Sequence, residues 1–348
     1  MKNLPSVTVI IPCLNEKDFI GNCLDSVIAN DYPKDVLEVL VIDGISKDGT
    51  REILQEYAEK YPFVSMLENH KSITPAALNV GVRHAKGEII VRMDAHSTYE
   101  GSYISKCVRY LDEYKADNVG GIWVTVARNG SLIAKAITIS LSHTFGVGNA
   151  YYRVGRPKEP MWVDTVPFGC YRKDIFNKVG FFDETVPRNE DIEFNARLRK
   201  SGGKILLVPD IAINYYARTD LKQFIRHNFD NGLKVTYPFN LHRMIFSWRH
   251  LIPFIFVVSL FVSLGVWWLS CPFGVTCLMG LSMFLSIVGV YLLVNSYFSV
   301  KVAIREKDLK ILFLVPVVFA LLHLSYGTGS VCGLLKCLFR RRNDSQVV

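Results

Sequence analysis

The sequence predicts an α/β domain built on a mostly parallel, doubly wound sheet, followed by apolar helices that belong in a membrane. Strand-like and helical patterns alternate through residue 93, as in parallel sheets that helices cover on both faces. Asp43 and Asp94 directly follow two of the predicted strands. From residue 251 onward the chain turns apolar, which explains a mean hydropathy of +0.21 beside an ordinary 21% of charged residues.

The first strand is predicted at residues 7–11, a β-branched run that ends at Pro12. Asn15 stands where a side chain could cap the helix that follows. Apolar residues then recur at helical spacing and mark one buried face: Phe19, Ile20, Cys23, Leu24, Val27 and Ile28. This segment predicts the first strand–helix unit of the sheet.

Three further strands follow in the same alternating order. They are predicted at residues 38–42, 64–67 and 88–93, with a helix around residues 53–58 and another at residues 74–85. Ligands of such sheets bind beyond the carboxyl ends of the strands. The two aspartates that follow the strands therefore mark the expected binding edge.

Motif spacing argues against several common sites. No GxGxxG follows the first strand and no GxxxxGK[ST] occurs, so we expect neither a dinucleotide-binding Rossmann domain nor a P-loop. The eight cysteines form no CxxC pair, which argues against zinc and thioredoxin chemistry. The net charge of +8 is assigned to basic flanks of a membrane protein, such as residues 340–342, and nucleic acid is not an expected partner.

Residues 251–269 hold no charge and are long enough to span the ~30 Å hydrocarbon core of a bilayer. A second stretch covers residues 275–300, and a charged loop at 301–310 separates it from a third at 311–335. The third stretch contains Pro316, His323, Gly327 and Gly329. A full third span would place residues 340–342 across the membrane from the charged loop, against the positive-inside tendency. We therefore favour two spans followed by a broken, re-entrant or interfacial helix pair over three spans.

Three acidic features could carry chemistry. Asp94 and His96 lie two residues apart at a strand end, and their oxygen and imidazole ligands suit one octahedral Mn²⁺ or Mg²⁺ ion. Asp43 opens an acidic, glycine-bearing turn, which would also be explained as a simple loop and helix cap. Glu190 and Asp191 open a helix, where the dipole favours carboxylates in any case and keeps them ionised, as a general base requires.

In this order, these features resemble the inverting glycosyltransferases of family 2, which have the GT-A fold. The resemblance covers residues 6–234. Residues 7–16 resemble the family's first strand and donor-binding loop, which includes Pro12, Asn15 and Glu16. Asp43 matches the acid that contacts the nucleotide base in the family's DDGSxDGT loop.

The remaining motifs follow in the family's order. Residues 94–96 stand where the family has its metal-binding DxD, with His96 in place of the second acid. Residues 189–191 resemble the ED motif whose Asp is the catalytic base. Gln223, Arg226 and His227 resemble QxxRW, but His227 replaces its Trp, which argues against processive synthesis. The Asp-Ala-His variant is similar to bacterial exopolysaccharide glycosyltransferases of the succinoglycan type.

The resemblance implies a role for each of these residues. Asp191 would be the general base, and Glu190 would orient the acceptor or be the base itself, since the sequence does not separate two adjacent acids. Mg²⁺ or Mn²⁺ would be held by Asp94 and His96. The implied donor-binding residues are Pro12, Asn15, Glu16, Asp43, Asp94, Gln223 and Arg226, and the implied acceptor-binding residues are Gly169, Cys170 and Glu190.

We therefore expect a catalytic GT-A domain at residues 1–235, an interfacial helix at 236–250, and a membrane domain at 251–348 with two to three hydrophobic helices and a basic tail. With no signal peptide, the catalytic domain is expected in the cytosol, against the inner face of the cell membrane. The implied reaction moves a sugar from a nucleotide-diphosphate sugar, with UDP the expected nucleotide, to a polyprenyl-linked saccharide during cell-surface polysaccharide synthesis, within a possible assembly complex. The alternative is a non-catalytic scaffold that binds nucleotide sugars. A transporter is disfavoured because residues 251–300 contain no acid.

Overall fold

The computed structural model describes residues 4–155, 157–217, 220–236, 248–270 and 275–344. Contacts within the chain divide it into two compact units. The first unit consists of Met1–Val126 and Tyr151–Tyr216, and the second of Ala127–Ala150 and Ala217–Val348. The expected domain boundary at residue 235 falls inside the second unit and stays a prediction.

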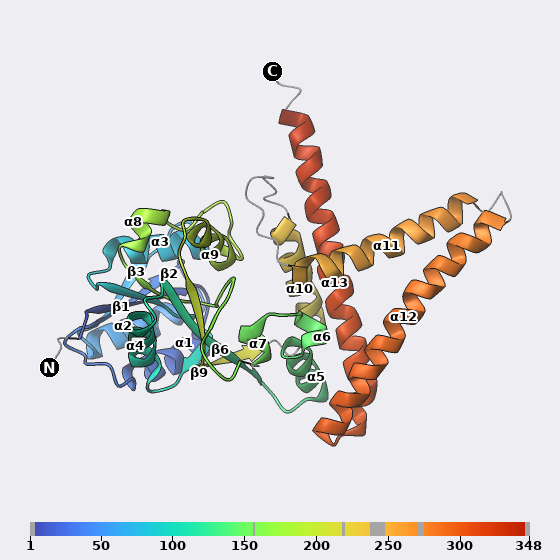
Figure 1. Cartoon of the computed structure of the whole chain (residues 1–348). Helices are drawn as coiled ribbons and strands as arrows, with labels where there is room; N and C mark the ends of the chain where they lie inside the picture. The colour runs from blue at the N-terminus through green and yellow to red at the C-terminus, as the bar shows by residue number, and fades with distance from the viewer. Residues whose placement is uncertain (1–3, 156, 218–219, 237–247, 271–274, 345–348) are drawn as a thin grey trace. The chain divides into compact units, whose positions relative to one another are not determined.

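The first unit is built on one mixed sheet, in which the described strands run in the order β3-β2-β1-β4-β8-β6-β9-β5, with β7 also paired to β9 (Figure 1). The parallel strands are β1 (Val7–Cys13), β2 (Leu37–Asp43), β3 (Val64–Glu68) and β4 (Ile89–Arg92). The others are β5 (Ser97–Tyr99), β6 (Asn118–Ala127), β7 (Met161–Trp162), β8 (Cys170–Arg172) and β9 (Ile205–Ala217). The four predicted strands are thus confirmed, and an antiparallel half extends the sheet beyond β4.

Helices cover both faces of this sheet, as the continuous apolar strands predict (Figure 1). Val9 and Ile11 of β1 pack in one core, and Ile10 between them packs in the other, because successive side chains point to opposite faces. The first core is closed by α1 (Lys17–Ile28), α2 (Thr50–Lys60) and α4 (Tyr103–Glu113), and the second by α3 (Thr74–His84), α8 (Ile175–Val179) and α9 (Glu190–Lys200). Gly81 of α3 lets the helix approach β1 closely, since a Cβ there would lie 2.5 Å from Ile10 Cγ2.

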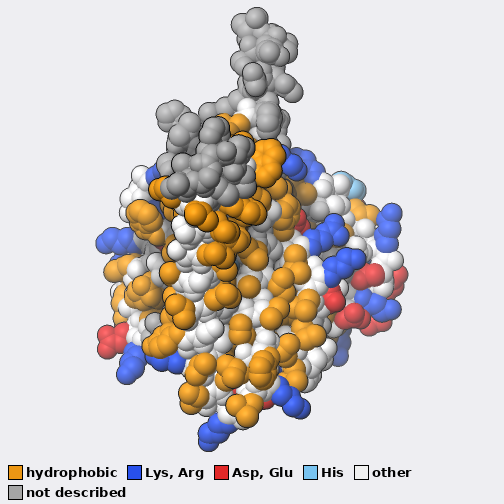
Figure 2. Space-filling model, turned by 90° about the vertical axis from the view of Figure 1, so that its right-hand side faces the viewer, with side chains coloured by type: hydrophobic (Ala, Val, Ile, Leu, Met, Phe, Trp, Pro, Cys, Tyr) orange, Lys and Arg blue, Asp and Glu red, His pale blue; other side chains and the backbone are white. Residues whose placement is uncertain are grey.

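The second unit contains the apolar helices. Its described helices are α5 (Leu132–Leu141), α6 (Thr144–Val147), α10 (Leu221–Thr236), α11 (Trp248–Ser270), α12 (Val275–Glu306) and α13 (Leu309–Asp344). Three of them, α11, α12 and α13, are long and apolar enough to cross a membrane. Hydrophobic side chains spread over their outer face, as Figure 2 shows. Such a face is typical of helices that contact lipid.

The third apolar stretch corrects one prediction, because α13 is one continuous helix and not a broken pair. Its glycines lie where other backbones come close. A Cβ on Gly329 or Gly333 would collide with backbone atoms of α10, and one on Gly327 would collide with the backbone of Pro253 in α11. From the sequence alone, glycines of this stretch indicate a helix break, whereas in the structure they permit close helix packing.

Polar side chains of the same helices also find partners inside the unit. His323 of α13 is hydrogen-bonded to the Tyr291 hydroxyl (2.9 Å) and to the Phe145 carbonyl (2.9 Å). Asn295 of α12 donates to the carbonyl of Pro316 (2.9 Å). Such hydrogen bonds hold packed apolar helices together, so His323 has a structural explanation.

The predicted interfacial helix at residues 236–250 lies largely outside the described residues. Thr236 ends α10, and Trp248 begins α11. This prediction is therefore left as an expectation.

Candidate active site

Two loops lie at the carboxyl edge of the sheet, the first after β1 and the second after β2, and hydrogen bonds join them. The Asn15 amide donates to Ser46 Oγ (2.8 Å), and Asn15 Oδ1 accepts from the Lys47 amide (2.9 Å). The Glu16 amide donates to Thr50 Oγ1 (2.9 Å). Asn15 does not cap α1, as the sequence suggested, because it has a left-handed backbone (φ 53°) and its side chain reaches across to the second loop. The two loops thus form one preorganised surface.

Asp43 shapes the second of these loops. Its carboxylate is fully buried and accepts from the amides of Ile45 (3.1 Å) and Ser46 (3.1 Å), from Ser46 Oγ (2.6 Å), and from Arg51 (3.0 Å). These bonds hold Ile45 at a positive φ of 65°, which a β-branched residue rarely adopts. Strain of this kind clusters at functional sites. The expected contact of Asp43 with a nucleotide base stays a prediction, and the carboxylate would share its oxygens with the loop.

Asp94 and His96 follow β4, and His96 lies beside Glu16 of the first loop. Asp94 Oδ2 lies 3.6 Å from His96 Nε2, and the other ring nitrogen of His96 lies 3.2 Å from Glu16 Oε1. A carboxylate oxygen and an imidazole nitrogen at this spacing can both reach one divalent ion, so these side chains fit the predicted Mg²⁺ or Mn²⁺. No group of three or more His, Cys, Asp or Glu in the described part of the chain is arranged to hold a metal. The protein would therefore supply two ligands and leave the other positions to water or substrate.

The structure separates the two adjacent acids. Glu190 is buried and pairs with Arg92, the last residue of β4, at 2.6 Å between Oε1 and Nη2. Burial raises the pKa of Glu190, Arg92 opposes that rise, and the neighbouring Asp191 adds to it. A carboxylate held by a buried guanidinium cannot swing out to a substrate without leaving that cation unpaired.

Asp191 has a different environment in the first turn of α9. It is partly exposed, and its Oδ1 accepts from the Ile192 amide (2.8 Å). Asn189, the residue before the helix, has a left-handed backbone with a φ of 62°. Of the two, Asp191 is the one whose carboxylate is accessible.

The predicted acceptor segment lies beside Arg92. The Arg92 amide donates to the Gly169 carbonyl (2.9 Å). Gly169 has a φ of 97°, and a Cβ there would lie 2.5 Å from the Tyr171 hydroxyl oxygen, so only glycine fits. Cys170 is fully buried in the core, and this burial raises the pKa of its thiol. Only its backbone remains for the predicted acceptor contact.

The other predicted site residues are placed as follows. Pro12 is buried within β1 and keeps the first loop at the sheet edge. Gln223 and Arg226 are both exposed and one turn apart on α10, which belongs to the second unit. Their expected contact with the donor stays a prediction.

Sequence reasoning missed Arg92. A charged residue inside the otherwise apolar run at residues 89–93 was the signal that could have revealed it, because a buried charge needs a partner. It also missed an aromatic group formed by Trp123 of β6, Tyr215 of β9 and the helical residue Tyr152.

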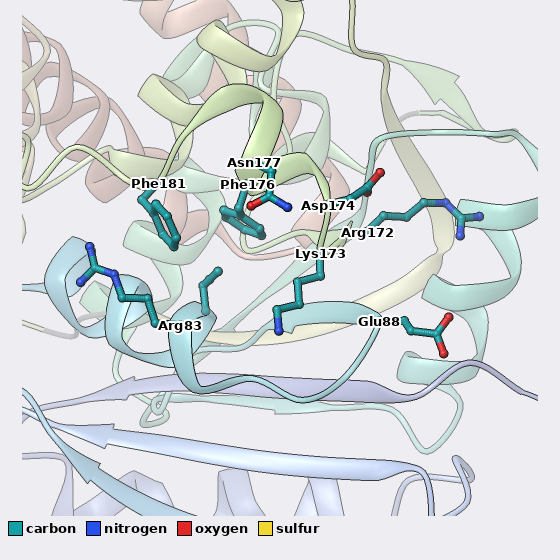
Figure 3. A pocket seen from close by; sticks show the side chains of 9 residues that line it. Arg83, Glu88, Arg172, Lys173, Asp174, Phe176, Asn177 and Phe181 are labelled. Carbon is teal, nitrogen blue, oxygen red and sulfur yellow. The ribbon is translucent and has the colours of Figure 1, made fainter.

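A hollow of about 680 Å³ lies at the opposite edge of the sheet (Figure 3). It is lined by residues at the beginning of β4 and the end of β8, whose register pairs Ile89 with Arg172. Its three cations are already engaged. Arg172 pairs with Asp112 (3.1 Å), Lys173 donates to the Ala85 carbonyl (2.5 Å), and the Arg83 guanidinium lies 4.9 Å from the Phe181 ring centroid. This hollow contains none of the predicted site residues.

Comparison with known proteins agrees with the class that the fold and the sheet-edge carboxylates define, an enzyme of the GT-A fold. The family model described as glycosyl transferase family 2 matches residues 8–180. The succinoglycan biosynthesis protein ExoA of Rhizobium meliloti (strain 1021) is 30% identical over 291 residues, which are 79% of this chain and 86% of that protein. The chain therefore belongs to glycosyltransferase family 2, and the resemblance seen in its motifs is confirmed.

A second relative matches nearly the whole chain. It is a Methanococcus voltae transferase named for a dolichyl N-acetyl-α-D-glucosaminyl phosphate acceptor, 28% identical over 95% of this chain and 97% of that protein. Among solved structures, the mannosyltransferase PcManGT of Pyrobaculum calidifontis, in complex with GDP-Man and Mn²⁺, has a TM-score of 0.53 and 19% identity. It covers 99% of this chain and 88% of that chain, and it shows that the two share a fold.

Proposed function

We propose that this glycosyltransferase is a membrane-anchored, inverting enzyme that moves a sugar from a nucleotide-diphosphate sugar to a lipid-linked saccharide during cell-surface polysaccharide synthesis. The observation that carries the proposal is the different environment of the two adjacent acids: Glu190 is held by Arg92, whereas Asp191 is accessible. The Methanococcus relative, whose name includes a dolichyl-linked acceptor, supports the choice of a lipid-linked substrate.

In this proposal the donor lies along the fastened loops at the sheet edge. Asp43 contacts the base, with UDP as the expected nucleotide, and Pro12, Asn15 and Glu16 form the wall beside it. Asp94 and His96 hold Mg²⁺ or Mn²⁺, which when bound would offset the charge of the diphosphate. Gln223 and Arg226 would contact the donor from α10.

Asp191 acts on the acceptor. It accepts the proton of the acceptor hydroxyl while that oxygen bonds to the anomeric carbon of the donor sugar. The bond from the anomeric carbon to the diphosphate breaks, and its electron pair leaves with the nucleoside diphosphate. Attack from the opposite side inverts the anomeric centre. Glu190 does not take the proton, but its pairing with Arg92 fixes the turn that carries Asp191, and Gly169 and Cys170 border the acceptor.

The function is tested by sugar transfer in membranes that contain the full-length protein. Labelled UDP- and GDP-sugars are supplied with a lipid extract from the native host, with Mn²⁺, with Mg²⁺ or with a chelator. The expected result is metal-dependent transfer from one donor into the lipid fraction. Metal-dependent nucleotide binding without transfer from any donor would favour the non-catalytic scaffold instead.

The metal ligands lead to a separate prediction. His96→Ala is expected to raise the Mn²⁺ concentration needed for half-maximal nucleotide binding about 10-fold or more, because one of two protein ligands is lost. The measurement is a Mn²⁺ titration of UDP binding, with His84→Ala as the matched control, because the His84 side chain at the end of α3 is exposed. An unchanged titration would remove His96 from the metal site.

The membrane topology can also be predicted. The apolar windows of α11 and α12 are each 11% buried, whereas that of α13 is 33% buried because α5 and α10 pack along it. We therefore propose that α11 and α12 span the cell membrane and that α13 lies at its cytoplasmic interface. A tag fused after Val348 should then be accessible from the same side as a cysteine placed in the loop near Asp308. A tag accessible only from the other side would establish a third span.

A further inference from the structure

An aromatic cluster of the first unit surrounds one arginine. The Trp123 and Tyr215 rings, from β6 and β9, are stacked with centroids 4.3 Å apart and an interplanar angle of 8°. The Arg153 guanidinium of α7 (Tyr151–Val154) lies 4.3 Å from the Trp123 ring centroid and 5.5 Å from that of Tyr152. The Phe168 ring lies 5.5 Å from that of Trp123, centroid to centroid, and is tilted by 38° to it.

Several hydrogen-bonding groups of this cluster have no hydrogen-bond partner among the described residues. Arg153 makes only ring contacts with the described residues, and its Nη1 atom is buried without a hydrogen bond. Trp123 Nε1 and Thr125 Oγ1 are also buried and unpaired, and they lie two residues apart on the same face of β6. An unpaired buried donor costs free energy, so three of them together indicate a ligand that would complete them.

The cluster is close to both parts of the proposed reaction centre. The Tyr215 ring is 6.0 Å from the ring of His96, one of the proposed metal ligands. The Phe168 ring lies 5.7 Å from the Arg92 guanidinium that holds Glu190. A ligand at the cluster would therefore be close to both the donor and the base.

The type of ligand follows from the geometry of Arg153. Stacking uses the flat face of a guanidinium and leaves its N–H groups, which lie in the plane, free to bind a phosphoryl group. The aromatic rings also restrain the side chain before it binds, which lowers the entropic cost of binding. The donor diphosphate already has the proposed cation at Asp94 and His96. Arg92 is paired with Glu190, which leaves Arg153 for a phosphate on the acceptor.

We propose that Arg153, with Trp123 Nε1 and Thr125 Oγ1, binds the phosphoryl group that joins the acceptor saccharide to its lipid. This assignment rests on the proposed function, and it specifies a phosphate-linked lipid as the acceptor class. Because the donor also carries phosphoryl groups, the test must distinguish the two sources.

The test measures binding and does not depend on turnover. Full-length protein in nanodiscs is titrated with polyprenyl phosphate, with polyprenol as the uncharged counterpart, and separately with UDP and Mn²⁺. The wild type is expected to prefer the phosphate at least 10-fold. Arg153→Gln should abolish this preference with an unchanged UDP affinity, and Arg153→Lys should retain part of it.

Arg109→Gln is the matched control, because Arg109 also stacks on a tyrosine, Tyr110 (4.7 Å), but lies on α4 and pairs with Asp210. It should behave as the wild type. A phosphate preference that survives Arg153→Gln overturns the proposal, and so does a variant that loses UDP affinity instead, which would assign Arg153 to the donor. If the wild type binds polyprenyl phosphate in this way but transfers no sugar, the binding site stands and the proposed function fails.

Discussion

Asp191→Asn is expected to lower the rate of sugar transfer by about 10²–10⁴-fold, the usual contribution of a well-placed general base. Asparagine keeps the shape of the side chain and its bond to the Ile192 amide but cannot take a proton at neutral pH. Nucleotide-sugar affinity should therefore be unchanged. The measurement is the transfer rate at saturating donor, together with donor affinity from calorimetry.

Glu190→Gln is the informative companion variant. Because Glu190 is buried against Arg92, its substitution should lower stability and weaken transfer less than Asp191→Asn does. If Glu190→Gln silences transfer in a protein of normal stability while Asp191→Asn stays active, the two roles are reversed.

Arg92→Met is expected to destabilise the first unit by about 3–5 kcal/mol, the usual cost of leaving one member of a buried ion pair without its partner. Arg92 is a suitable test because it and Glu190 are both buried and joined at 2.6 Å. The change also removes the guanidinium that lies over Phe168. The measurement is the melting temperature of the purified protein in detergent.

The double variant Arg92→Met with Glu190→Met separates the effect of the ion pair on stability from its effect on the transfer rate. It should recover most of the lost stability, since no unpaired charge remains in the core. It should not recover the transfer rate, because the turn that presents Asp191 is no longer fixed. A double variant that is no more stable than Arg92→Met would show that the charge of Glu190 is not what destabilises the single variant.

The parallel half of the sheet was predictable because each of its strands is a short apolar run with a local stop. β2 ends at Asp43, whereas β1 continues past the predicted stop at Pro12 by one residue, to Cys13, and the two ends pair at the same edge. The antiparallel half was not predicted, since β8 has three residues and β7 only two, too few for a periodic pattern. Their pairing depends on partners far along the chain, such as Ile89 with Arg172.

The third apolar stretch also shows that local sequence preference does not decide the structure. Proline and glycine at residues 316, 327 and 329 predicted a break, because both weaken an isolated helix. In α13 the glycines instead let the backbones of α10 and α11 approach, and packing of this kind outweighs a propensity of about 1 kcal/mol per glycine. The low helix propensity of these residues was recognised correctly, but their tertiary contacts determine that α13 is continuous.

The sequence by itself determined which chemical groups reach the sheet edge, because strand ends and helix starts are local features and Asp43, Asp94, Glu190 and Asp191 stand at them. It left the two adjacent acids equivalent, since they share a helix turn and a charge. Only the tertiary structure distinguished them, by bringing Arg92 from 98 residues away to pair with Glu190. The physical reason is that a buried guanidinium requires a carboxylate partner, and the fold brings only one of the two acids within its reach.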